Sequence, residues 1–148
     1  MSFSVDTNIL IYSINKGSLH YPEAKKFVEE ISSTPESWIF PWPIIHSFIR
    51  ITTHSGILPH PLSSAQSISV IDDFLNLPNV RLVSETDLFW KVYKKELQDG
   101  HFRGSFVSDV VIASLLKEHG VSRFYTADRD FLRFKGIHSI NPLEINAK

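Results

Sequence analysis

Four aspartates occupy positions from which carboxylates could act together. Asp6 directly follows the apolar run FSV, and Asp128 follows the apolar run RFYTA. Asp109 lies near the start of the apolar stretch VSDVVIASLLKEHG, and Asp130 follows Asp128 by two residues. Each aspartate alone is also a good helix N-cap, so a single one says little. Three that converge on one edge of a sheet would instead indicate a binding site.

A cluster of carboxylates predicts a bound cation, because packed like charges repel and disfavour the ionised form. The chain has no cysteine, which excludes disulfides and thiolate metal sites. Oxygen ligands alone favour Mg²⁺ or Mn²⁺ over zinc. The histidines do not change this choice, since none has the paired i, i+4 spacing of a shared metal site. They are His20, His46, His54, His60, His101, His119 and His138.

The segments that must position these aspartates alternate between short apolar strands and amphipathic helices. The predicted strands are FSV, WIF, NVRLV, RFYTA and the start of HSINPLEIN. The predicted helices are TNILIYSI, Pro22 with EAKKFVEEI, PIIHSFIRITTH, residues 63–76, ETDLFWKVYKKEL, VSDVVIASLLKEHG and DRDFLRF, with Ile68 and Leu88 among the core positions. This alternation predicts one α/β domain over residues 1–148, with a parallel sheet covered on both faces. Ligands bind beyond the carboxyl ends of the strands in such sheets.

Composition places the chain among globular proteins. It has 148 residues, is 43% hydrophobic and has a formal net charge of −1, unlike a strongly basic nucleic-acid coat protein. No run approaches the roughly 18 apolar residues of a membrane span. The N-terminus has no Lys or Arg before Lys16, which is atypical of a secretory signal. We therefore expect a soluble, cytoplasmic protein that is not associated with a membrane.

Three stretches stand out when they are taken together: VDTNILIY, SFVSDVVIASLLKEHG, and FYTADRDFLRF followed by INPL. Together they resemble the PIN-domain family, and specifically the VapC-type toxins of bacterial and archaeal toxin–antitoxin pairs. Either DTN or DRDF alone would be a weak signal, whereas the whole set in this order is a fairly specific signature. The order and spacing extend through essentially the whole chain.

The resemblance implies a three-layer α/β/α fold with a central, mostly parallel sheet. It also implies a Mg²⁺- or Mn²⁺-dependent endoribonuclease, the toxin of a toxin–antitoxin pair. Asp6 matches the first acid of the family, Asp109 the acid of the central helix and Asp128 the last acid, so these three are expected to bind the metal and carry catalysis. Asn8 and Thr126 match polar positions that support the site. RNA as substrate, a small antitoxin protein as partner and a homodimer are further expectations.

One departure concerns the helix after the second strand. The family usually has a glutamate there, in a context like Glu-Phe-Leu-Arg, whereas this chain has Ser47 before Phe48. No acid lies between Glu36 and Asp72. An alternative is therefore an inactive or weakened PIN module that binds RNA or a protein partner. Another alternative is a phosphatase with an aspartyl nucleophile on the first strand, although such enzymes usually have a second acid where this chain has Asn8.

Several other residues, most of them near the acidic motifs, could also have a role in the site. Asp130 could compensate for the missing glutamate or could simply place a charge in the first turn of a short helix. Arg103, Arg129 and Arg133 could bind phosphate or could belong to a solvated surface. The aromatic residues Trp38, Phe40 and Trp42 are expected in the core or at a dimer contact rather than as a platform for bases.

Overall fold

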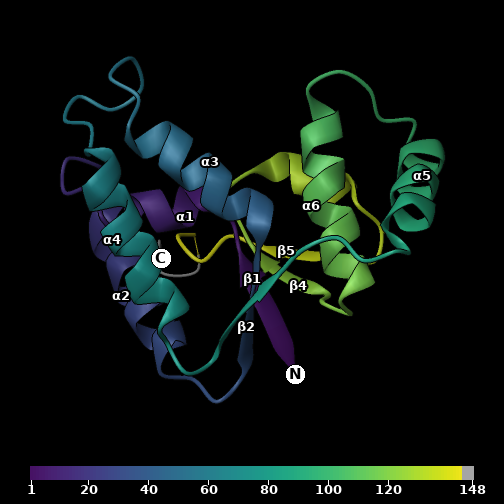
Figure 1. The fold of residues 1–148 in the computed structure, drawn as a ribbon, viewed down its shortest axis with the longest axis horizontal. Coiled ribbons are helices and arrows are strands. Elements are labelled where there is room, and N and C mark those ends of the chain that lie inside the picture. Colours follow the sequence, from purple (N-terminus) through teal and green to yellow (C-terminus); the bar gives the residue numbers. More distant parts are fainter. Residues whose placement is uncertain (145–148) are drawn as a thin grey trace.

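A sheet of five parallel strands forms the centre of the computed structural model, which describes residues 1–144 (Figure 1). Every neighbouring pair of strands is parallel, which confirms the predicted α/β class. The predicted domain 1–148 and the predicted tail HSINPLEIN extend into residues 145–148, which lie outside the described residues. The strands are β1 (Ser2–Val5), β2 (Ser37–Pro41), β3 (Val80–Val83), β4 (Arg123–Tyr125) and β5 (His138–Ile140).

The order of the strands places a crevice between β1 and β4. The sheet has the order β3-β2-β1-β4-β5, so the chain builds outward from β1 on one side and then returns to build the other side. This reversal is a topological switch point, where the connections leaving neighbouring strands diverge and leave room for a ligand. Asp6 directly follows β1, and Asp128 follows β4 by three residues.

The helices flank the sheet in two groups (Figure 1). In the first group α1 contacts α2 and α3, and α3 contacts α4; in the second group α5 packs against α6. Among residues 1–144, no helix combines the length and the apolar character needed to traverse a membrane. The helices are α1 (Thr7–Tyr12), α2 (Tyr21–Ser32), α3 (Trp42–Thr52), α4 (Ser64–Leu75), α5 (Phe89–Gly100), α6 (Phe106–Glu118) and the 3₁₀ helix η1 (Arg129–Arg133).

Local sequence explains where several of these helices begin. Both α2 and α3 have a proline in the first turn, where its missing N–H is not needed. The helix α4 begins with a capping box, in which Ser63 and Gln66 each accept a hydrogen bond from the other's backbone N–H. The helix α6 is buried mainly between Val110 and Leu116, as its apolar sequence predicts.

Aromatic residues of the two central strands form the middle of the core. Phe3 of β1 stacks on Trp38 of β2 with ring centroids 6.1 Å apart, and Trp38 stacks on Phe40 at 5.7 Å. All three side chains are almost completely buried. The prediction of a core position is therefore confirmed for Trp38 and Phe40, whereas Trp42 at the start of α3 is 52% exposed.

Two predicted core residues are on the surface instead. Ile68 is 50% exposed because the inward face of α4 is formed by Ser67, Ile71 and Phe74. Ser67 can be buried there because its hydroxyl is hydrogen-bonded to that of Thr52, with the two oxygens 2.8 Å apart. Leu88 is 65% exposed because it precedes the first turn of α5, a helix with no fully buried residue.

Candidate functional site

The ends of β1 and β4 are joined by a short chain of hydrogen bonds. The backbone N–H of Asp6 donates to the Tyr125 carbonyl over 2.8 Å, which extends the pairing of the two strands by one residue. The Thr126 hydroxyl donates to Asp6 Oδ2 over 2.6 Å and accepts from the Asp128 N–H over 3.0 Å. Asp6 Oδ1 accepts from the Thr7 N–H over 2.8 Å. Thr126 therefore fixes the orientation of Asp6 and the backbone position of Asp128.

Three carboxylates meet next to this chain. Asp109, Asp128 and Asp130 each direct one oxygen to a common region, and these oxygens lie within 4.8 Å of one another. Asp128 also caps η1, because its Oδ1 accepts from the Asp130 N–H over 2.9 Å. This is the only such group of metal-ligating side chains among residues 1–144, and it contains no histidine.

The predicted acids thus share one cleft but are not equivalent. Asp6, Asp109 and Asp128 all line a cavity of about 550 Å³ at the carboxyl ends of the strands. Asp6 is not part of the close group of three oxygens, because its own oxygens are engaged by Thr126 and Thr7. Asp130, which the sequence suggested only as a possible substitute, lies in that group.

The electrostatics of the cleft favour proton uptake when no cation is bound. Burial raises the pKa of Asp6 from 3.8 to about 6, although hydrogen bonds from Thr126 and Thr7 oppose this effect and the charge of Asp128 adds to it. The pKa of Asp109 rises from 3.8 to about 6 as well, first through burial and then through the nearby charges of Asp128, Asp6 and Asp130. Positive charge placed among these carboxylates would reverse both shifts.

Two further polar side chains face the acids. Asn8 follows Asp6 in the first turn of α1 and lines the same cavity, and its side-chain oxygen is buried with no hydrogen-bond partner among the described residues. Ser47 on α3 lines this cavity and an adjoining one that also contains Asp6 and Asp109. The residue at the position of the expected glutamate therefore does face the acidic cleft.

Part of the wall of the cleft is apolar, and one basic residue also lines the cavity. Ile11, Ile51 and Leu58 line it, and Arg50 of α3 extends into the same cavity. The sequence analysis did not select Arg50. Its position could have been predicted from the sequence, because Arg50 follows Ser47 by three residues and residues three apart lie on the same face of a helix.

The arginines that the sequence analysis selected do not line this cavity. Arg129, in the first turn of η1, lines a smaller cavity of about 150 Å³ together with Thr126 and Asp128. Arg133 at the end of η1 lies over the rings of Phe102 and Phe106, and Arg103 is exposed on the loop before α6.

Comparison with known proteins links this arrangement to one family. Residues 4–137 match the family model of the PIN domain. Ribonuclease VapC48 of Mycobacterium tuberculosis is 31% identical over 142 residues, which is 96% of this chain and 98% of that protein. Ribonuclease VapC37 of the same organism is 29% identical over 138 residues, or 93% and 95% of the two chains.

Solved structures share the fold at lower identity. The VapBC2 complex of Rickettsia felis, bound to a DNA fragment from its promoter, contains a chain that matches with a TM-score of 0.67 and 20% identity, over 95% of this chain and 98% of that one. The sarcin–ricin loop cleaving toxin VapC20 of Mycobacterium tuberculosis matches with a TM-score of 0.64 and 18% identity, over 88% and 92%. At these identities the match shows the fold.

Proposed function

Because the chain belongs to the PIN-domain family, we propose that it is a divalent-metal-dependent endoribonuclease and the toxin of a VapBC-type toxin–antitoxin pair. The observation that carries the proposal is the convergence of Asp109, Asp128 and Asp130 at the switch point of the sheet, beside Asp6. The relatives that match over nearly the whole chain are named ribonucleases.

The donor set of the cleft fits Mg²⁺ or Mn²⁺. These ions prefer oxygen ligands at about 2.0–2.2 Å, so the ligand oxygens of one ion lie roughly 3–4 Å apart. The oxygens of Asp109, Asp128 and Asp130 lie within 4.8 Å of one another, close to that requirement. The unpartnered oxygen of Asn8 is an acceptor suited to a metal-bound water. We propose Asp6, Asp109 and Asp128 as the family ligands, with Asp130 as an additional one.

A bound divalent ion would supply a water of lowered pKa and would neutralise the charge that develops on the phosphate. The protein's own contribution is positioning. Thr126 holds the Asp6 carboxylate at one orientation, because it donates to one oxygen while Thr7 donates to the other.

We also propose a small antitoxin protein as partner, together with a homodimer. Structures of related fold include the VapBC-1 complex of nontypeable Haemophilus influenzae and a DNA-bound VapBC complex of Salmonella typhimurium. A segment that covered the apolar wall formed by Ile11, Ile51 and Leu58 would close the acidic cleft to RNA.

The decisive experiment is RNA cleavage by the purified protein in Mn²⁺. We expect a structured RNA to be cut, the activity to disappear with EDTA, and Asp109→Asn to lose at least two orders of magnitude in rate while remaining folded. Asp72→Asn changes an exposed acid on α4 and is the matched control, which should cut as the unmodified protein does. Equal rates for Asp109→Asn and Asp72→Asn would show that the assigned cleft is not the active site.

Ser47 favours one alternative, a PIN module that binds RNA or a protein without cutting. Ser47 faces the cleft at the position where the family usually has a glutamate, so a bound metal would have one carboxylate fewer available. This alternative predicts RNA binding with no cleavage in either Mg²⁺ or Mn²⁺. Asp130 opposes it, because it adds a carboxylate to the group from a different segment.

A further inference from the structure

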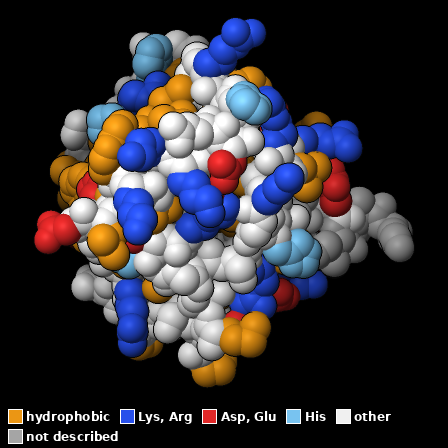
Figure 2. Space-filling model, turned by 90° about the vertical axis from the view of Figure 1, so that its right-hand side faces the viewer, with side chains coloured by type: hydrophobic (Ala, Val, Ile, Leu, Met, Phe, Trp, Pro, Cys, Tyr) orange, Lys and Arg blue, Asp and Glu red, His pale blue; other side chains and the backbone are white. Residues whose placement is uncertain are grey.

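Charge is distributed unevenly along this chain. Residues 1–90 contain five Lys or Arg and nine Asp or Glu, whereas residues 91–135 contain nine Lys or Arg and six Asp or Glu. Three of those six acids are Asp109, Asp128 and Asp130 of the site. The second segment includes α5, α6 and η1, and the side of the molecule where α5 and α6 lie shows more Lys and Arg than Asp and Glu (Figure 2).

One arginine on this side is held in place by aromatic rings. The guanidinium carbon of Arg133 lies 4.4 Å from the ring centroid of Phe106 and 5.1 Å from that of Phe102. Phe102 stacks on Phe134 with centroids 4.6 Å apart, so the rings form a small platform. Cation–π contact of this kind limits the motion of an otherwise flexible side chain.

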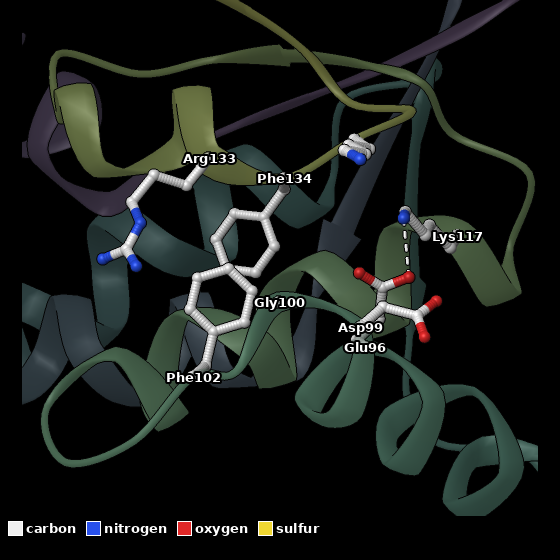
Figure 3. Close-up of a pocket in the computed structure, with 8 residues that line it drawn as sticks. Glu96, Asp99, Gly100, Phe102, Lys117, Arg133 and Phe134 are labelled. Atoms are coloured by element: carbon white, nitrogen blue, oxygen red, sulfur yellow. Dashed lines mark hydrogen bonds and ion pairs between the residues drawn. The ribbon is translucent and has the colours of Figure 1, made fainter.

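The donors of Arg133 are available to a ligand. The side chain is exposed, and within residues 1–144 it has neither an ion pair nor a hydrogen bond. Figure 3 shows its guanidinium on the far side of the stacked Phe102 and Phe134 rings from Glu96 and Asp99. Of these two acids, Glu96 is already paired with Lys117 over 2.6 Å.

Arg133 is connected to the acidic cleft through two elements of the fold. It ends η1, the short helix that begins directly after Asp128. Its ring partner Phe106 precedes Asp109 by three residues in α6, and such spacing puts two side chains on one face of a helix. Arg133 is therefore connected to two of the site acids through rigid elements.

On the basis of the proposed function, we propose that Arg133 binds a backbone phosphate of the RNA adjacent to the one that is cut, with Phe102 and Phe106 holding its guanidinium ready. The planar fork of donors in arginine matches phosphate oxygens, and phosphate contacts fix the register of a nucleic acid without reading its sequence. The RNA then passes from the acids over η1 toward α5 and α6, and not along the apolar wall beside α1 and α3. This assignment gives Arg133 a positioning role in cleavage.

The test is the salt dependence of RNA binding, which does not depend on cleavage. A fluorescently labelled RNA hairpin is titrated in EDTA by anisotropy at several KCl concentrations. Arg133→Ala should weaken binding about fivefold and should flatten the slope of log K against log[KCl] by about 0.7, the contribution of one phosphate contact. Arg133→Lys should keep the slope and lose only part of the affinity, because the charge stays while the planar, ring-held geometry is lost.

Arg81→Ala is the matched control, because Arg81 is an exposed arginine on β3, separated from β4 and η1 by β2 and β1. It should change neither affinity nor slope. If Arg133→Ala and Arg81→Ala behave alike while the unmodified protein binds RNA, the subsite is refuted and the nuclease proposal stands. If the unmodified protein binds RNA through Arg133 but cuts nothing in Mn²⁺, the nuclease proposal fails and the subsite stands. Absence of RNA binding in EDTA would refute the subsite, and cleavage in Mn²⁺ would then decide the nuclease proposal separately.

Discussion

Replacing Asp109 by asparagine should stabilise the protein in EDTA. The carboxylate of Asp109 has no hydrogen bond within residues 1–144, and it lies among Asp6, Asp128 and Asp130. Burial and these charges raise its pKa from 3.8 to about 6. Because one pKa unit corresponds to about 1.4 kcal/mol, keeping this group ionised at pH 7.5 destabilises the fold by at most about 3 kcal/mol. The side chain is partly solvated, so we expect a gain of about 1 kcal/mol, or roughly 3 °C in Tm.

The difference in stability between Asp109→Asn and the unmodified protein should also depend on pH, in a direction that can be checked. The folded pKa of Asp109 is raised, so the folded protein binds the proton more tightly than the unfolded chain does. Protonation of Asp109 therefore stabilises the folded protein; this contribution is fully present below about pH 4 and is lost as the pH rises through 6. The melting temperature of Asp109→Asn should therefore exceed that of the unmodified protein at pH 7.5 in EDTA, and the difference should shrink toward pH 4.

Metal should reverse the order of stability. An ion that binds only the folded protein adds RT ln(1 + [L]/Kd), which is about 2.7 kcal/mol when the ion is present at a hundred times Kd. Asparagine is a poorer ligand than aspartate, so the variant should gain much less from millimolar Mn²⁺. The measurement is thermal melting of both proteins in EDTA and in Mn²⁺, with Asp72→Asn as the control that follows the unmodified protein in each buffer.

A structural role for Asp109 predicts the opposite result in EDTA. Asp109 lies in the first turn of α6, where a negative charge stabilises the helix by about 0.3–1 kcal/mol. If this interaction dominated, Asp109→Asn would melt at a lower temperature than the unmodified protein, and both would respond alike to Mn²⁺. That pair of results would refute the carboxylate cluster as a metal site.

Three further changes test other parts of the structure. Ser47→Glu adds a carboxylate to the cleft and should tighten Mn²⁺ binding in a calorimetric titration; unchanged or weaker binding would mean that another residue already fills the coordination shell. Thr126→Val removes both hydrogen bonds of the buried hydroxyl and should lower the free energy of unfolding in urea by about 1–3 kcal/mol, whereas Thr126→Ser should restore most of it. Lys117→Met leaves the poorly exposed Glu96 unpaired and should speed hydrogen exchange in α5, while Lys25→Met, in an exposed pair on α2, should not; equal exchange in both variants would refute a role for the ion pair in holding α5.

The convergence of Asp6, Asp109 and Asp128 could be predicted because it depends on short sequence patterns around each residue. Asp6 and Asp128 follow apolar runs that form strands, and parallel strands end at the same edge of a sheet. Asp109 could be placed beside them because an almost wholly apolar helix must be central. The order of the strands has no local signature, so the prediction of a PIN-like sheet rested on the resemblance rather than on periodicity.

The sequence could not reveal which oxygens meet, because that depends on side-chain orientation and packing. Asp130 joins Asp109 and Asp128 because η1 begins directly after Asp128, whose Oδ1 accepts a hydrogen bond from the Asp130 N–H. Asp6 is directed toward Thr126 by a hydrogen bond between residues 120 positions apart. The same limit explains Ile68, which is displaced from the core by a buried serine whose hydroxyl partner lies on another helix.

The central position of β1 has a consequence for the biosynthesis of the protein. The strand β1 pairs with β4, which is made much later, and the hydroxyl that orients Asp6 comes from Thr126, so segments far apart in the sequence build one cleft. A nascent chain that stops before residue 123 has Asp6 and Asp109 but lacks the strand and the threonine that organise them. We therefore expect a translation intermediate of this length to be unable to cut RNA, including the message and the ribosome from which it emerges. For the proposed toxin, we therefore expect that an inhibitor is needed only after β4 and Thr126 have been made.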